Sequence, residues 1–359
     1  MQPMRERWTI EKAREWYSKY PWPVGCNFIP STAINQLEMW QEDTFDPETI
    51  DRELGWAAGL GMNTVRVFLH DAAWSVDPGG FKKRVRRYLD IAGGRGLLTA
   101  FVLFDDCWHP DPKPGRQPDP RPGIHNSGWV QSPGITAARD RSEWKRLESY
   151  VRDIVGMLGR DDRVLMWDLY NEVGNFFLPA LSLPAFKRIP KLAYLLFRHR
   201  CLPIETLPLF RAVVLWVRDS GPAQPVTAGI WFVNGGLNRE LIDASDIITF
   251  HNYRNAANLE ARIRALEKHG RPLLCTEYLA RSAGSRFETC MPVFKRHDAG
   301  CCSWGLVSGK TQTIFSWTDR GGNSEPGTWY HDIFRRDGTP YSEEEISFIR
   351  AMTGAKASE

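Results

Sequence analysis

Two glutamates stand at the ends of apolar segments whose composition predicts buried strands. One segment runs Val-Leu-Met-Trp-Asp-Leu-Tyr and is followed by Asn171 and Glu172, and another runs Leu-Leu-Cys-Thr and ends at Glu277. A carboxylate at the end of a buried strand is costly unless it is paired or functional. Two carboxylates that meet at one edge of a sheet are the minimum set for glycoside hydrolysis. The competing interpretation is that each glutamate forms an ion pair with a rim arginine.

Eight short apolar runs, typical of parallel strands that are covered on both faces, alternate with amphipathic segments. The predicted strands are residues 24–28, 64–69, 98–104, 164–170, 225–228, 247–251, 273–277 and 301–306, and the main predicted helices are 49–60, 81–92, 141–158, 207–219, 259–269, 286–297 and 342–352. Strand–helix alternation repeated eight times favours a closed barrel over an open doubly wound sheet. No glycine-rich phosphate loop follows the first strand, which disfavours a nucleotide-binding fold.

The predicted fold is therefore α/β, a single (β/α)8 TIM barrel formed by one catalytic domain over residues 1–359. Two connections are too long for plain loops, at about 105–140 after the third strand and 173–205 after the fourth. Both leave the carboxyl ends of strands, where barrel enzymes build their sites. We interpret them as insertions at the rim of the barrel.

Composition limits the classes of partner. Lys and Arg number 46 against 43 Asp and Glu, a net charge of +3, which is too small for a dedicated nucleic-acid binder. The basic run 82–87 lies on a predicted helix and is interpreted as a solvated face. The 15 Trp residues suit flat ligands such as sugars. Seven cysteines without CxxC spacing, and an N-terminus unlike a signal peptide, predict a cytoplasmic protein, or a secreted or periplasmic one if an export signal has been removed.

An ordered set of residues, one group on each expected strand, carries a resemblance to a known family. The groups are Asn63-Thr-Val-Arg66 on the second strand, Asn171-Glu172 on the fourth, His251-Asn-Tyr253 on the sixth, Thr276-Glu277 on the seventh and Ser303-Trp304 on the eighth. In this order they resemble the glycoside hydrolases of clan A, and most closely family five, the cellulase-like family. The resemblance implies retaining hydrolysis of β-linked glucans, xylans, mannans or smaller β-glycosides, without a cofactor or metal.

Carried over to this sequence, the resemblance implies that Glu172 is the general acid/base and Glu277 the nucleophile. Arg66 would hold Glu277 ionised, and Tyr253 would donate a hydrogen bond to it. Glu172 must stay protonated at the working pH, which requires a raised pKa.

The resemblance further implies that Asn171 contacts the sugar 2-hydroxyl, that His251 orients Glu172 or relays protons, and that Trp304 forms the floor of the sugar site. One element departs from the family pattern. The family places a histidine close to the end of the third strand, whereas here the chain reads Phe104-Asp-Asp-Cys-Trp-His109. Asp105, Asp106 and His125 are therefore competing candidates for the polar contacts there.

Further candidates lie in the rim loops, where exposed indoles either stack on sugars or pack within the loop. They are Trp108, Trp129, Trp317 and Trp329, together with the turn-rich stretch 123–131. Three residues after the first strand, Asn27, Glu38 and Trp40, are also plausible substrate contacts.

The insertion after Glu172 is apolar and basic. Residues 173–204 contain five basic residues (Lys187, Arg188, Lys191, Arg198 and Arg200) and no acid. Such a segment can close over a substrate, form a contact in a homo-oligomer, or rest on a membrane. We expect a lid or subunit contact first and a glycolipid or membrane contact second, so membrane contact is not the leading expectation.

Two hypotheses from other classes remain. One is a carbohydrate-binding barrel without turnover, although binding alone would not require Glu172, Glu277, Arg66 and Tyr253 together. The other is a metal-dependent hydrolase, for which His70-Asp71, Asp105-Asp106 and His251 give a weak indication. Asp105, Asp106, His109 and Asp111 resemble a metal cluster in composition only, because the prolines around them favour a rigid turn.

Overall fold

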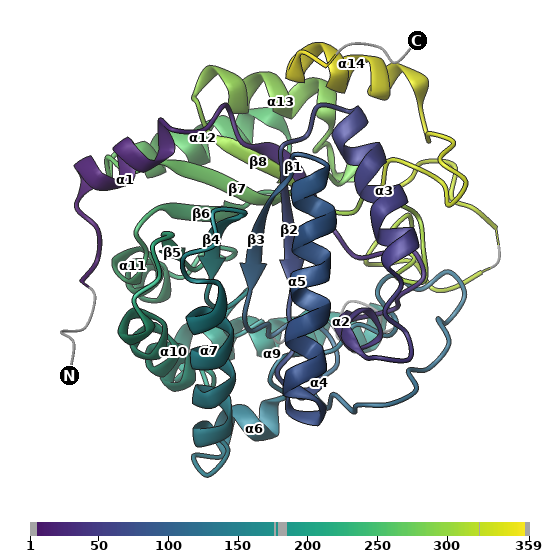
Figure 1. Cartoon of the computed structure of the whole chain (residues 1–359). Helices are drawn as coiled ribbons and strands as arrows, with labels where there is room; N and C mark the ends of the chain where they lie inside the picture. The colour runs from purple at the N-terminus through teal and green to yellow at the C-terminus, as the bar shows by residue number, and fades with distance from the viewer. Residues whose placement is uncertain (1–5, 176, 179–184, 323, 356–359) are drawn as a thin grey trace.

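Eight parallel strands form the centre of the molecule (Figure 1). The computed structural model describes residues 6–355 apart from 176, 179–184 and 323. The strands are β1 (Val24–Asn27), β2 (Thr64–Phe68), β3 (Leu98–Val102), β4 (Val164–Asp168), β5 (Val226–Thr227), β6 (Ile248–His251), β7 (Leu273–Tyr278) and β8 (Gly300–Ser303). Each predicted apolar run overlaps one of these strands, in sequence order, so the (β/α)8 barrel is confirmed.

The sheet runs in the order β5-β4-β3-β2-β1-β8-β7-β6, and its two edge strands approach each other to complete the barrel. The amide of Ile230, just after β5, donates to the carbonyl of Thr249 at 2.9 Å, and the amide of His251 donates to the carbonyl of Ile230 at 2.9 Å. The hydroxyls of Thr227 and Thr249 lie 2.8 Å apart. The barrel is therefore nearly closed although β5 is short, and the carboxyl ends of all eight strands face one opening.

Helices cover the outside of the barrel. They are α3 (Pro47–Gly59), α5 (Pro78–Gly94), α7 (Trp144–Leu158), α10 (Leu207–Ser220), α11 (Gly235–Ala244), α12 (Ala256–Glu267), α13 (Phe287–Arg296) and α14 (Glu343–Thr353). All seven predicted helices are present. Helix α11 was not predicted; it begins with two glycines, which favour a turn, but the side chain of Asn234 caps it by accepting from the amide of Leu237 at 3.1 Å.

Shorter elements close the two ends of the barrel. Helix α1 (Ile10–Tyr17) packs Trp16 and Tyr17, with Trp8 before it, against strand residues such as Leu165 at the amino-terminal end. At the carboxyl end lie α2 (Gln36–Trp40), α4 (Asp71–Val76), α6 (Ile135–Arg139) and the 3-10 helix Arg281–Ala283. The opening for a ligand therefore lies at the carboxyl end.

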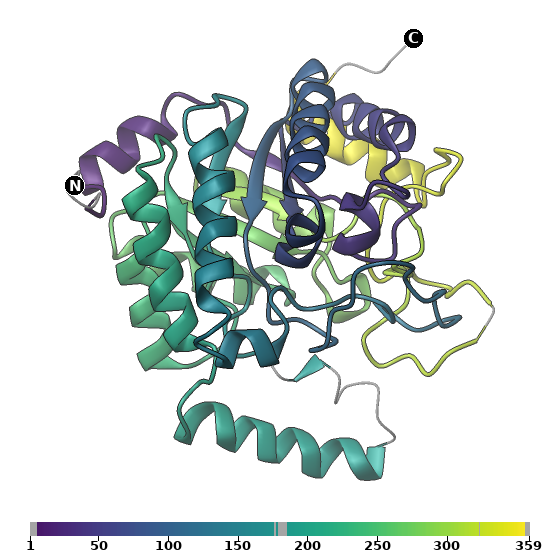
Figure 2. The ribbon, with the colours of Figure 1, turned by 60° about the horizontal axis from the view of Figure 1, so that its bottom comes forward.

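The two predicted insertions both lie at this carboxyl end. The segment after β3 folds back on itself through bridges between Asp105 and Ser132 and between His109 and Val130. The segment after β4 contains helix α9 (Ala185–Cys201), which stands beneath the barrel opening and apart from the outer ring of helices (Figure 2). Over the described ranges, the search for a helix with the length and hydropathy of a membrane span finds no candidate.

Candidate active site

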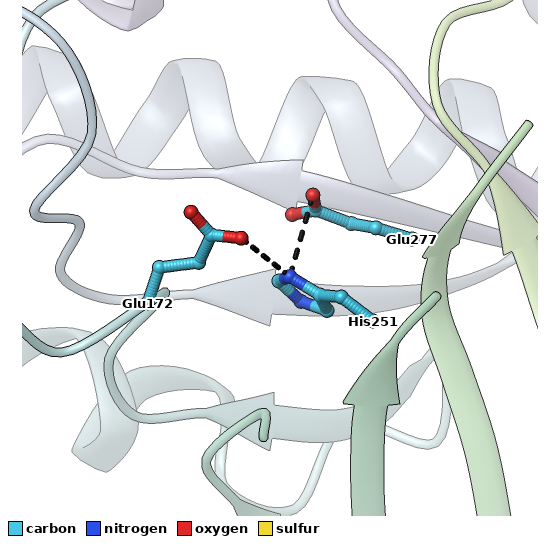
Figure 3. A group of neighbouring side chains, drawn as sticks. All are labelled: Glu172, His251 and Glu277. Carbon is cyan, nitrogen blue, oxygen red and sulfur yellow. Dashed lines mark hydrogen bonds and ion pairs between the residues drawn. The ribbon is translucent and has the colours of Figure 1, made fainter. Parts of the chain in front are cut away.

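Three side chains from different strands meet at the opening (Figure 3). Glu277 lies within β7, His251 ends β6, and Glu172 follows β4. The Nδ1 atom of His251 is 2.8 Å from Oε1 of Glu172 and 3.4 Å from Oε2 of Glu277. One oxygen of each glutamate and a ring nitrogen of His251 all lie within 4.8 Å of one another, and all three residues are buried. The structure thus brings the two predicted carboxylates into one site.

Local departures from regular geometry aim these side chains. Glu172 has a φ of 48°, a left-handed conformation that costs a residue with a Cβ on the order of 1–3 kcal/mol. The β6–β7 register shifts beside His251, and the β7–β8 register shifts between Cys275 and Tyr278, a segment that includes Glu277. Irregularities of this kind redirect side chains near functional sites. The chain therefore bends at each of the three positions that supply the cluster.

Arg66, which is fully buried in β2, connects four strand ends. Its Nη1 donates to Oε1 of Glu277 at 2.7 Å and to Oδ1 of Asn27 at 2.9 Å. Its Nε and Nη2 donate to Oδ2 of Asp168 at 3.0 and 2.7 Å, and Nη2 also donates to Oδ1 of Asn171 at 2.7 Å. A planar guanidinium with five donors suits such a network. Arg66 thereby fixes one face of Glu277.

The other oxygen of Glu277 accepts a hydrogen bond from the Tyr253 hydroxyl at 2.7 Å. Burial, together with the nearby Glu277 carboxylate, holds the pKa of Tyr253 well above its usual range, so this hydroxyl keeps its proton and donates. Burial raises the pKa of Glu277, while the Arg66 guanidinium opposes the rise. The charged form of Glu277 is therefore paired directly with a cation and with a phenol donor.

Glu172 has different partners. Its Oε2 accepts from the thiol of Cys107 at 3.2 Å and from the side-chain amide of Asn175, while Oε1 faces His251. Burial raises the pKa of Glu172 and lowers that of His251 to about 4, so the imidazole is neutral near pH 7. Because both groups at Oε2 are donors, the proton of the acid form belongs on Oε1. The hydrogen-bond partners of Glu172 are thus neutral groups, whereas Glu277 is bonded to a permanent cation.

A cleft of about 450 Å³ lies over this pair. Its walls include the imidazole of His125 and four of the indoles named in the sequence analysis, Trp108, Trp129, Trp304 and Trp317. Trp108 stacks on His125 with ring centroids 5.6 Å apart, and Nε1 of Trp129 donates to Oδ2 of Asp105 at 2.7 Å. The aromatic floor and rim expected from the sequence therefore surround Glu172 and Glu277.

Asp106 and Asn27 do not line this cleft. Asp106 is buried and accepts from the hydroxyl of Tyr170 at 2.8 Å, from the amide of Gly174 at 2.6 Å and from the hydroxyl of Thr206. It fastens both ends of the second insertion. Asn27 accepts from Arg66 and donates to the carbonyls of Thr276 and Ser303, so it positions Arg66.

Three weaker candidates also lie elsewhere. Trp40 is buried and donates to the carbonyl of Phe68, and Trp329 is buried and stacks on Tyr341. Glu38 forms an ion pair with Lys310 at 2.5 Å. Glu38 therefore stabilises a loop. The two indoles stabilise the core, because an indole that fits a core cavity buries more apolar area there than on a rim.

Several residues at the site were not predicted. Asp168, Cys107 and Asn175 contact Arg66 or Glu172 directly, and Trp231 and Phe232 line the cleft. Asp168 was recognisable as a charge inside an otherwise apolar strand, and Trp231 and Phe232 as aromatics just after the fifth strand. Nothing in the sequence pattern identified Cys107 or Asn175.

The acids and histidines that suggested a metal cluster are dispersed. His70 contacts Asp71, and Asp111 forms an ion pair with Lys113. The ring of His109 faces the carbonyl of Ser127 instead of either pair. Among the described residues, the grouping with a suitable separation for a metal ion is Glu172, His251 and Glu277. There the Arg66 guanidinium, 2.7 Å from Glu277, already supplies a positive charge and would repel a second cation.

The chain is similar in fold to solved glycoside hydrolase structures. A GH5_18 protein from Streptomyces cattleya, in complex with GlcNAc, is 14% identical, with a TM-score of 0.58 over 92% of this chain and 79% of that one. The exo-β-1,4-mannosidase Op5Man5 from Opitutaceae bacterium strain TAV5 is 18% identical, with a TM-score of 0.58 over 92% of this chain and 59% of that one. The hyperthermostable endo-1,4-β-D-mannanase from Thermotoga petrophila RKU-1 is 13% identical, with a TM-score of 0.53 over 91% and 99% of the two chains.

No protein-family profile and no curated protein sequence matches the chain. At identities this low, the structural similarity shows that the chain has the same barrel fold as these proteins. This chain spans somewhat more than half the length of the mannosidase.

Replacing Arg66 by Met should destabilise the protein by about 3–5 kcal/mol, because Asp168 and Glu277 would remain buried without their cation. Urea unfolding followed by tryptophan fluorescence measures this change. Arg95→Met is the matched control, because it removes a half-exposed ion pair with Asp51 and should cost at most about 1 kcal/mol. Equal losses in the two variants would contradict the role given to Arg66.

Proposed function

We propose that the chain is a retaining β-glycoside hydrolase in which Glu277 is the nucleophile and Glu172 the general acid/base. The observation that carries the proposal is the pair of buried carboxyls in one cleft, with different partners and with one oxygen of each lying within 4.8 Å of the other. Retaining enzymes hold their carboxyls about 5–5.5 Å apart, whereas inverting enzymes need about 6.5–9.5 Å to admit a water. The short separation supports retention.

In the first step, a Glu277 oxygen forms a bond to the anomeric carbon while the glycosidic carbon–oxygen bond breaks. Glu172 transfers its proton to the leaving oxygen and becomes a carboxylate. In the second step, this carboxylate takes a proton from water, the water oxygen bonds to the anomeric carbon, and the bond to Glu277 breaks. Arg66 and Tyr253 stabilise the ionised Glu277 before and after each cycle.

The walls of the cleft suit a sugar. Indoles present flat apolar faces to the rings, and the neutral His251 holds Oε1 of Glu172 in place. Asn171 donates weakly to the thiol of Cys107 at 3.3 Å, a bond that a sugar 2-hydroxyl can replace. The proposed substrates are β-linked polysaccharides or oligosaccharides of the glucan, xylan or mannan type. The similar structures support this class, because they include a GlcNAc complex, a β-mannosidase and a β-mannanase.

Glu172→Gln and Glu277→Gln should respond differently to the leaving group. With a β-glycoside of dinitrophenol, which leaves without protonation, Glu172→Gln should still release one equivalent of dinitrophenolate rapidly. Glu277→Gln should lose activity on every substrate, on the order of 10⁴–10⁶-fold. Stopped-flow absorbance gives both rates, and circular dichroism checks that each variant is folded. A rapid burst from Glu277→Gln would refute its assignment as nucleophile.

The pH dependence of kcat/KM should be bell-shaped. Activity requires Glu277 ionised and Glu172 protonated, so it rises as Glu277 loses its proton and falls as Glu172 does. Because burial raises both pKa values, both limbs should lie above the ordinary carboxyl range. In Cys107→Ala, loss of the thiol that donates to the ionised Glu172 should move the alkaline limb to higher pH. Initial rates across pH measure this shift, and an alkaline limb that stays in place would count against it.

A further inference from the structure

The side chains of helix α9 separate into two faces. Leu195 and His199 point inward and are buried, and Leu192 lines the cleft. On the outward side, Ile189 is 66%, Tyr194 52% and Phe197 57% exposed. Large apolar side chains at such exposure on one helix mark an interaction surface. Figure 2 shows α9 standing beyond the barrel opening, where a flat partner can reach this outward side.

Basic residues border the apolar side. Lys187 and Lys191 are exposed and, four residues apart, lie on one edge of the helix. Lys191 also lies over the Tyr194 ring, 5.5 Å from its centroid. Five basic residues and no acid occur between Glu172 and Glu205. An apolar side with a basic edge is the pattern of a helix that lies in the interface of an anionic membrane.

The inward side of α9 joins an apolar wall of the cleft through Leu192. Phe177, Leu178, Leu192, Trp231 and Phe232 all line the cleft that contains Glu172 and Glu277. Phe177 and Phe232 stack with ring centroids 5.2 Å apart. This wall offers a substrate few hydrogen-bond partners. It can therefore receive an apolar aglycone as well as the face of a sugar ring.

We propose that the outward side of α9, formed by Lys187, Ile189, Lys191, Tyr194 and Phe197, binds the surface of an anionic lipid bilayer, and that a β-glycoside with a lipid aglycone is a further substrate of the cleft. The substrate half of this proposal rests on the proposed function. The apolar wall receives the first part of the lipid while the sugar reaches Glu172 and Glu277. We call these five residues the α9 face.

The sequence analysis offered two other interpretations of this segment, a contact between two copies of the chain and a lid over the cleft, and both fit the α9 face less well. A second copy of the chain would bring two acid-free basic helices together in a symmetric contact, where like charges repel. A lid that closes on the cleft would bury the inward side of α9 and leave the α9 face exposed. The order inferred from sequence, with lid or subunit contact ahead of membrane contact, is therefore reversed here.

Binding is tested by co-sedimentation with vesicles of phosphatidylcholine alone and of equal parts phosphatidylcholine and phosphatidylserine. The protein should bind the mixed vesicles and be released by salt. The double variant Lys187→Gln/Lys191→Gln should bind about 30-fold more weakly, at roughly fivefold for each basic side chain. Its matched control is Lys83→Gln/Arg87→Gln on α5, which removes two exposed charges away from α9 and should bind as the parent does.

Phe197→Ser tests the apolar part of the α9 face, and Leu215→Ser on α10, a position with 49% exposure, is its control. Phe197→Ser should weaken vesicle binding and the hydrolysis of a long-chain alkyl β-glycoside embedded in vesicles. It should leave hydrolysis of the soluble nitrophenyl β-glycoside of the same sugar unchanged.

The outcomes separate the two proposals. Activity on the soluble glycoside without vesicle binding would overturn the membrane proposal and leave the proposed function intact. Vesicle binding without turnover of any glycoside would overturn the proposed function. A concentration-dependent dimer in light scattering that Phe197→Ser abolishes would instead assign the α9 face to a second copy.

Discussion

The site depends on one buried cation. Arg66 has no access to water and donates to carboxylates on two other strands, Asp168 on β4 and Glu277 on β7. Removing a guanidinium from water costs several kcal/mol, and only close, well-oriented carboxylates offset that cost. The ends of β2, β4 and β7 must therefore stay in register for the protein to be stable. The ion pair that holds these strand ends together also orients Glu277.

Around this centre, the two carboxyls differ through their neighbours rather than through their depth. Both are buried, so burial raises both pKa values. Glu277 contacts a permanent cation and a phenol that cannot ionise at ordinary pH. Glu172 contacts a weak thiol donor, an amide and a neutral imidazole. Two side chains of the same type therefore have different electrostatic environments, because Glu277 is paired directly with a full positive charge and the partners of Glu172 are neutral.

The rim insertions are attached to the same framework. Asp105 and Asp106 are adjacent in sequence, but they face opposite directions. Asp105 accepts from Trp129 and Asn171 beside the cleft, whereas Asp106 ties Gly174 to Thr206 at the two ends of the second insertion. Helix α9 can therefore extend away from the barrel while Gly174 before it and Thr206 after it are both held by Asp106.

Local patterns were sufficient to predict the eight strands, because parallel strands buried on both faces leave continuous apolar runs. Glu172 and Glu277 stood out because each follows or ends such a run, whereas Arg66 and Tyr253 were predicted from the resemblance to clan A glycoside hydrolases. Local patterns could not show that Asp106 holds the second insertion or that Trp40 belongs to the core. Those roles depend on distant partners, Thr206 for Asp106 and Phe68 for Trp40. Cys107 was not predicted for the same reason, because its contribution to the site is a hydrogen bond to Glu172, 65 residues away in the sequence.

The most direct test of the account is to map the residue that becomes covalently bonded to substrate. The protein is incubated with 2-deoxy-2-fluoro β-glycosides of the gluco, manno, xylo and galacto series that carry a dinitrophenolate leaving group, and is then digested and analysed by mass spectrometry. The account predicts one fluoroglycosyl group per chain, on the peptide that contains Glu277. A label on Glu172 or on any other residue would contradict it.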